Sequence, residues 1–184
     1  MESKLIENYL EDIKYCNENE IGKFIIFVKG EQTLIKINEY IKEKGYKIEV
    51  IGITFPANEI TFEENEEGEI VEYIPESSKG DKIKELLNEQ GIILIRSALP
   101  FEGIVIPGEN FNPYKIVSNT LNLVYDGLAN IIQSTMIATD NGVLKTGESA
   151  VVSNANIFVD IRGVNSRMLF HPKLGLDIEF IYKK

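Results

Sequence analysis

The feature that most constrains the fold is a strand–turn–helix–strand pattern over residues 23–56. It opens with five consecutive apolar residues, 24–28, and a run this short and rich in β-forming side chains predicts a strand buried on both faces. A sharp turn is expected at Gly30, and a helix with apolar residues on one side then ends at Gly45. A second apolar run, 48–53, completes a βαβ unit whose two strands should be parallel neighbours.

The rest of the pattern predicts one α/β domain over residues 1–184. The expected elements are a helix over 2–17, a helix over 79–90 capped by Ser77 or Ser78, a strand over 92–95, helical residues from Pro113 to 140 with a break at Gly127, and strands over 149–153, 156–161, 168–170 and 176–182. Between residues 59 and 72 lie seven glutamates, which are typical of a solvated hairpin and lack the Asp/Asn spacing of a calcium loop.

Composition limits the possible partners. The formal net charge is −10, and such a surface repels phosphate backbones and anionic lipids, so we expect no nucleic-acid and no membrane partner. One cysteine and one histidine exclude an internal disulfide and a cysteine-rich metal site, so no metal or cofactor is expected. The acidic start does not resemble a signal peptide, and no apolar run approaches the roughly 20 residues of a membrane span, which predicts a cytoplasmic protein.

Three short motifs in the second half of the chain carry a resemblance to a known family. They are Ser97-Ala98-Leu99-Pro100-Phe101-Glu102-Gly103, then Met136-Ile137-Ala138-Thr139-Asp140-Asn141-Gly142-Val143-Leu144 with Gly147-Glu148 after it, and the stretch from Arg162 to Pro172. With this spacing the chain resembles the C-terminal α/β domain of pyruvate kinases, especially the stand-alone pyruvate kinase C-terminal-like proteins of archaea and bacteria.

The resemblance implies a fold and a role. The fold is a three-layer α/β/α arrangement around a mixed, mostly parallel five-stranded sheet of order 3-2-1-4-5, with the last strand antiparallel. In pyruvate kinases this domain is regulatory and binds a sugar phosphate, while the catalytic barrel and its metal site belong to other domains. No pyruvate kinase activity is therefore expected here. The chain departs from the family where a Gly-rich turn keeps only Gly163, and where Glu31 opposes phosphate binding.

The predicted site lies beyond the carboxyl ends of the parallel strands, where ligands of such sheets collect. The turn over 29–33 stands at a helix N-terminus, which favours an anion. Two arginines near a glycine suit carboxylate or phosphate capture on the opposite wall. The predicted anion-binding residues are Lys29, Gly30, Gln32, Thr33, Asn154, Arg162, Gly163, Asn165, Ser166 and Arg167, with Arg96 and Ser97 only at the rim.

Each of these residues also has a purely structural interpretation. Gly30 would only shape its turn, Thr33 would only cap a helix, and the arginines would pair with surplus glutamates. Asp140 is as well explained by a capping role as by chemistry. His171 and Cys16 are expected to be structural, because no partner that would activate either one is visible in the sequence.

Two classes of function stay open. The first is a regulatory or accessory module that binds a phosphorylated or carboxylated metabolite, and the second is a small metabolic enzyme that uses the same cleft. No general base is evident, so we assign no catalytic residue and favour binding. A pocket with an acid–base pair of perturbed pKa would favour the enzyme. The edge-like strand 176–182 also predicts a homo-oligomer, because open sheet edges tend to find a partner.

Overall fold

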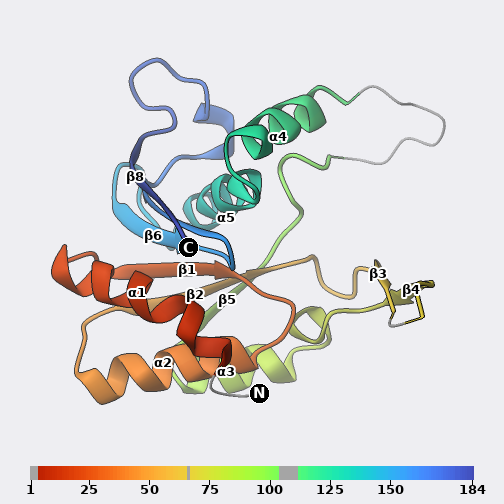
Figure 1. Cartoon of the computed structure of the whole chain (residues 1–184), viewed down its shortest axis with the longest axis horizontal. Coiled ribbons are helices and arrows are strands. Elements are labelled where there is room, and N and C mark those ends of the chain that lie inside the picture. Colours follow the sequence, from red (N-terminus) through yellow and green to blue (C-terminus); the bar gives the residue numbers. More distant parts are fainter. Residues whose placement is uncertain (1–3, 66, 104–111) are drawn as a thin grey trace.

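A six-stranded sheet forms the middle of three layers in the computed structural model, which describes residues 4–65, 67–103 and 112–184 (Figure 1). Its strands are β1 (Lys23–Phe27), β2 (Glu49–Thr54), β5 (Ile93–Arg96), β6 (Ser149–Ser153), β7 (Ile157–Arg162) and β8 (Ile178–Lys183). The helices are α1 (Lys4–Glu18), α2 (Gln32–Lys44), α3 (Lys82–Glu89), α4 (Pro113–Val124) and α5 (Leu128–Asp140). A separate hairpin consists of β3 (Thr61–Glu64) and β4 (Ile70–Tyr73), and two short 3-10 helices cover Glu76–Ser78 and Ser166–Met168.

The strands follow the order β5-β2-β1-β6-β7-β8. The first four are parallel, β7 is antiparallel to β6, and β8 is antiparallel to β7. The predicted α/β class and mostly parallel sheet are therefore confirmed. The predicted count of five strands is wrong, and the full order differs from the predicted one, because β8 pairs with β7 and adds a sixth strand after the five that follow the predicted order. The antiparallel strand that was expected at the edge consequently lies inside the sheet.

The central strand β1 is buried on both faces, as its unbroken apolar run predicts. Phe24 and Ile26 pack into the core beneath α1, α2 and α3, whereas Ile25 points to the core beneath α5. Figure 1 shows α1, α2 and α3 on one face of the sheet and α4 and α5 on the other. Because side chains alternate along a strand, β1 contributes to two separate apolar cores, one on each face of the sheet.

The covering helices begin and end where the sequence carries breakers. The Asn112 side chain accepts a hydrogen bond from the Tyr114 N–H, so α4 starts at Pro113 as expected. Gly127 takes a left-handed φ of 82° and separates α4 from α5, which confirms the predicted break. Of the helices that lie in the described ranges, none has both the length and the apolar character needed to cross a bilayer.

Three local predictions need correction. Neither Ser77 nor Ser78 caps α3, which begins only at Lys82; both serines are buried in the preceding 3-10 helix, where the Ser77 hydroxyl contacts Thr54 and the Val28 carbonyl. Residues 168–170 form no strand, because a 3-10 helix and a turn occupy this region. The start of the predicted helix 2–17 falls partly outside the described residues, and α1 ends at Glu18.

Candidate functional site

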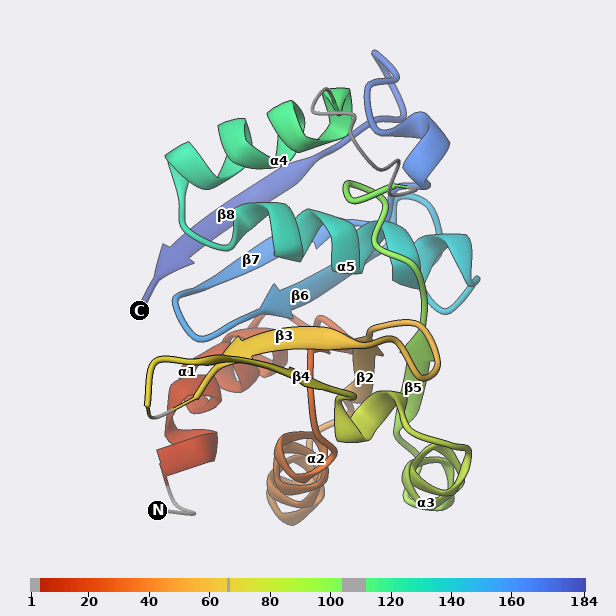
Figure 2. The same cartoon turned by 90° about the vertical axis from the view of Figure 1, so that its right-hand side faces the viewer.

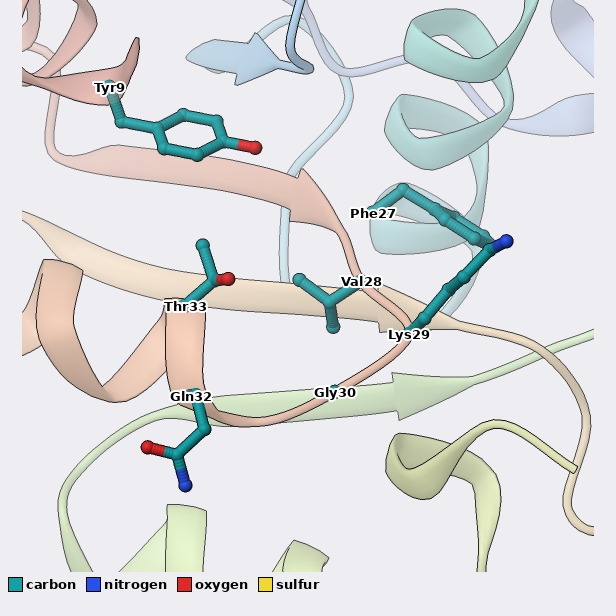
Figure 3. A pocket seen from close by; sticks show the side chains of 7 residues that line it. All are labelled: Tyr9, Phe27, Val28, Lys29, Gly30, Gln32 and Thr33. Carbon is teal, nitrogen blue, oxygen red and sulfur yellow. The ribbon is translucent and has the colours of Figure 1, made fainter. Parts of the chain in front are cut away.

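A pocket of about 250 Å³ lies at the carboxyl end of β1, where the chain turns into α2. Its lining comes from α1, from the end of β1 and from the first turn of α2: Tyr9, Phe27, Val28, Lys29, Gly30, Gln32 and Thr33 (Figure 3). Four of these are predicted site residues. The topology explains the position, because β1 has parallel neighbours on both sides and its carboxyl end faces the crossover to α2.

The hydroxyl groups of Tyr9 and Thr33 lie on the same side of the turn, and both point toward the space above Val28 (Figure 3). Gln32 points away from that space, and its amide donates to the Glu31 carboxylate over 3.2 Å. The Lys29 ammonium lies 5.8 Å from the centre of the Tyr73 ring in β4, so this lysine reaches toward the hairpin. Two neutral donors therefore face the pocket, and the nearby cation sits at its border.

The first turn of α2 supplies the remaining polar groups. The N-cap residue of α2 is Glu31, so the expected capping role of Thr33 is wrong. The Glu31 side chain itself makes no capping hydrogen bond. Uncapped N–H groups at a helix start carry partial positive charge. The chain bends at Gly30 as expected, although without a left-handed φ, and a Cβ placed on this residue would meet no atom within 4 Å. Open space therefore lies against the backbone at this position.

Behind Tyr9 lies a buried polar cluster that the sequence did not reveal. The Lys184 ammonium is 2.7 Å from an Asp12 carboxylate oxygen, donates to the Ser153 hydroxyl over 3.0 Å, and lies 4.6 Å from the centre of the Tyr9 ring. The Ser153 hydroxyl also donates to Asp12 over 2.5 Å, and the Asn154 carbonyl accepts from Lys184 over 2.7 Å. The cluster ties α1, the end of β6 and the last residue of the sequence together.

Burial perturbs both charged members of this cluster. Removal from water raises the pKa of the Asp12 carboxyl, although the Lys184 charge and the hydrogen bonds from Lys184 and Ser153 act in the opposite direction. Burial likewise lowers the pKa of the Lys184 ammonium, against the attraction of Asp12. Asp12 and Ser153 are at most 1% exposed, so a molecule in the pocket cannot touch them while Tyr9 stays in place.

The Asn154 side chain stabilises the β6–β7 turn. Its side-chain oxygen accepts hydrogen bonds from the backbone N–H groups of Asn156 and Ile157, and its amide donates to the Gly127 carbonyl. This is the pattern of an Asx turn, in which the side chain organises the local backbone. Asn154 stands at the same end of the sheet as the pocket but is absent from its lining.

The other predicted wall lies at the opposite end of the sheet. Arg162 pairs in register with Ser149, the first residue of β6, whereas the pocket stands beyond the last residues of β1. Because Val151 is level with Phe24, Ser149 is level with Gly22, and the distance along the strands from there to Val28 is about 20 Å at ~3.3 Å per residue. The 29–33 turn and the 162–167 turn therefore do not form one crevice.

The 162–167 residues have structural partners where they lie. Arg162 pairs with Asp177 at 3.2 Å and Glu179 at 3.7 Å, as its structural interpretation expected. Gly163 is packed so closely against the Lys145 carbonyl and the Leu144 side chain that an added Cβ would collide with both. Arg167 is exposed in the 3-10 helix that follows.

Asp140, at the end of α5, binds the same turn. One of its carboxylate oxygens accepts from the Asn165 side-chain amide over 3.0 Å and from the Ser166 N–H over 3.1 Å, and the Thr146 hydroxyl donates to the side-chain oxygen of Asn165. The Asp140 carboxylate therefore links the end of α5 to the 162–167 turn through hydrogen bonds.

The remaining candidates are structural as well. Arg96 binds the Ser77, Lys79 and Gly80 carbonyls and the Asp81 carboxylate. The Cys16 thiol is fully buried and its pKa is raised well above the ordinary value by burial, so it is a poor nucleophile. His171 accepts two backbone hydrogen bonds in a turn. Across the described ranges, no three His, Cys, Asp or Glu side chains are grouped to hold a metal ion.

Comparison with known proteins gives only remote structural similarity. No family model matches the chain, and no curated protein sequence matches it. The crystal structure of a pyruvate kinase from Cryptosporidium parvum is similar with a TM-score of 0.43 and 11% identity, over 86% of this chain and 22% of that chain. This chain thus spans about a fifth of the length of that enzyme. A match this remote does not establish a family, so the pyruvate kinase resemblance stays a prediction.

Proposed function

We propose that the pocket between α1, the end of β1 and the start of α2 binds a small anion, the phosphate or carboxylate group of a metabolite, in a regulatory or accessory role. The observation that carries this proposal is the uncapped start of α2, which opens onto a pocket that contains the Tyr9 and Thr33 hydroxyls. Helix N-termini bind anions through free N–H groups and the helix dipole. The pocket volume of about 250 Å³ suits the charged head of a ligand rather than a whole cofactor.

The ligand contacts follow from the lining. Backbone N–H groups of the α2 start and the two hydroxyls would donate to the anion, and Lys29 would contribute its charge from the border. The open space at Gly30 lets a ligand approach the backbone closely. Glu31 stands at the same turn and lowers the affinity for highly charged anions, which favours a single phosphate or carboxylate group over a polyphosphate.

Replacing Lys29 by alanine, or Thr33 by valine, should weaken the binding of such an anion. A hydrogen bond to a charged group contributes about 1.5–3 kcal/mol, so the loss for each change is roughly ten- to a hundredfold in dissociation constant. A thermal-shift screen of phosphorylated and carboxylated metabolites would find the ligand, since binding to the native state raises the melting temperature. Calorimetric titration of the variants would then measure the effect.

The matched control is Arg162→Ala, which removes a cation at the opposite end of the sheet and should leave the affinity within about twofold. The proposal is overturned if Lys29→Ala and Thr33→Val bind as the wild type does, or if Arg162→Ala is the variant that loses affinity.

An enzyme that uses this cleft is the second candidate, and the perturbed Asp12–Lys184 pair beside Tyr9 favours it. The burial of Asp12 and Ser153 argues against it, because a substrate in the pocket reaches neither group. Binding is therefore the function that the geometry supports better.

We also propose that the chain self-associates along β8, which is the last strand of the sheet order. Helix α4 lies beside β8 (Figure 2). It exposes four large apolar side chains: Tyr114, Ile116, Leu123 and Val124. Light scattering at about 100 micromolar protein, in salt that screens charge repulsion, should show a dimer or larger assembly. Leu123→Glu, at a position that is 87% exposed, should shift the protein to monomer without loss of fold. A monomeric wild type would contradict this proposal.

A further inference from the structure

A second, larger hollow lies on the other flank of α1, between this helix and β8. Its volume is about 610 Å³, which is within the range of small-molecule sites. The lining combines α1 residues with aromatic residues of the last two strands: Glu7, Leu10, Glu11, Lys14, Tyr15, Glu18, Phe158, Phe180 and Tyr182. Tyr9, which lines the anion pocket, is not part of this groove, so the two sites are separate.

The aromatic side chains form one continuous wall. Tyr15 and Phe180 are stacked with an angle of 10° between their rings, and their centroids are 5.7 Å apart. Phe158 and Tyr182 are stacked at 5.1 Å. Phe180 remains 42% exposed, so the wall presents π faces and ring edges to the groove rather than closing on itself completely. Aromatic faces attract organic cations and repel anions.

Asp160 is not one of the residues that line the groove but adjoins this wall, and one of its carboxylate oxygens is unused. It pairs in register with Phe180, and it alternates with Phe158 along β7, so all three side chains leave the sheet on the α1 side. The residue is 6% exposed; one oxygen accepts from the Tyr15 hydroxyl over 3.1 Å, and the other has no hydrogen-bond partner among the described residues. A buried carboxylate oxygen without a donor is costly, and a ligand N–H group would satisfy it.

The charges around the groove also favour a cation. The exposed side of α1 contributes three negative charges and one positive charge to the groove lining, from Glu7, Glu11, Glu18 and Lys14. On the strand side, the nearby Arg162 is already paired with Asp177 and Glu179. The net charge of the lining is therefore negative, which raises the local concentration of positively charged ligands.

We propose that the α1–β8 groove binds the ammonium group of a small organic amine, with its alkyl chain on the aromatic wall and its N–H groups directed to Asp160. The interpretation without a ligand, in which the rings only cover the sheet edge, explains the Tyr15 contact but leaves the second Asp160 oxygen unsatisfied. The same ammonium chemistry occurs in free amines and in lysine side chains of peptides, and the probes below distinguish these sources.

The test is an NMR titration of the full chain with butylammonium chloride, and separately with Nα-acetyl-lysine amide, in 150 mM salt, where weak surface attraction is screened at distances beyond roughly 8 Å. Saturable shifts of amides in residues 14–18, 158–160 and 179–182 are expected. Binding of butylammonium alone assigns the site to free amines, and binding of both extends it to lysine side chains. Absence of saturable shifts with both probes overturns the proposal.

Asp160→Asn should raise the dissociation constant at least about tenfold, since the charge-assisted bond is lost. The matched control is Glu64→Gln in the exposed hairpin, which removes the same charge elsewhere and should change nothing. Equal weakening by both variants would show unspecific attraction to an acidic surface and overturn the proposal. Phe180→Leu, at a half-exposed position, is a second variant that removes the π face and should also weaken binding, even if Asp160→Asn does not fold.

Discussion

Replacing Asp12 by alanine is expected to lower the free energy of unfolding by about 3–5 kcal/mol, because it leaves the Lys184 ammonium buried without its counter-charge. Asp12 is fully buried and the Lys184 side chain is only 13% exposed, so water cannot take over the lost contact. The Ser153 hydroxyl and the Asn154 carbonyl remain, but they offer dipoles in place of a charge. Urea denaturation followed by circular dichroism would measure the change.

The double variant Asp12→Leu with Lys184→Met is the control, since a well-packed apolar pair often replaces a buried ion pair at no net cost. It should recover most of the lost stability. The raised pKa of Asp12 adds a pH test: the folded state favours the protonated carboxyl, so the stability of the wild type relative to the double variant should fall as pH rises through the folded-state pKa. An Asp12→Ala variant that loses less than about 1 kcal/mol would show that the pair is solvated.

Replacing Gly163 by alanine should destabilise the fold by about 1–3 kcal/mol or more, because the new methyl group would be forced against backbone that cannot easily move. The nearest atoms are the Lys145 carbonyl oxygen and the Leu144 side chain, and two backbone hydrogen bonds, from Gly163 to Glu148 and from Gly147 to Gly163, hold the segments together. The glycine therefore permits close packing of two chain segments. Thermal unfolding should show a decrease of several degrees in midpoint.

Gly22→Ala is the matched control for this prediction. A Cβ at Gly22 would meet only the Lys47 carbonyl oxygen, at 4.0 Å, which is an ordinary contact distance. Its unfolding midpoint should stay close to that of the wild type. If Gly163→Ala is equally well tolerated, the packing explanation for the glycine at this position is wrong.

The sequence was most informative where local periodicity and topology coincide. The apolar run 24–28 predicted a central, doubly buried strand, and the turn after it predicted the pocket that the structure contains. The 162–167 turn was assigned to the same crevice although strand 156–161 was already expected to be antiparallel. The carboxyl end of an antiparallel strand lies at the opposite end of the sheet from the carboxyl ends of its parallel neighbours. This is the case for β7.

Contacts between the two ends of the chain could not be predicted from local patterns. Lys184 and Asp12 are separated by almost the entire sequence, and nothing in the composition near either residue marks it as a partner. The same applies to Tyr9, whose place in the pocket depends on how α1 lies across β1 and β6. Only the assembled fold brings these side chains to the carboxyl end of β1.

We propose that anions bind at the start of α2 and not at the arginine-containing turn over residues 162–167. This proposal is tested most directly by mapping backbone amide shifts in a titration with inorganic phosphate and with acetate. Saturable shifts are expected in residues 28–34 and at Tyr9, with residues 162–167 unaffected. Shifts centred on residues 162–167, or no saturable shift in residues 28–34 with either anion, would contradict the proposal.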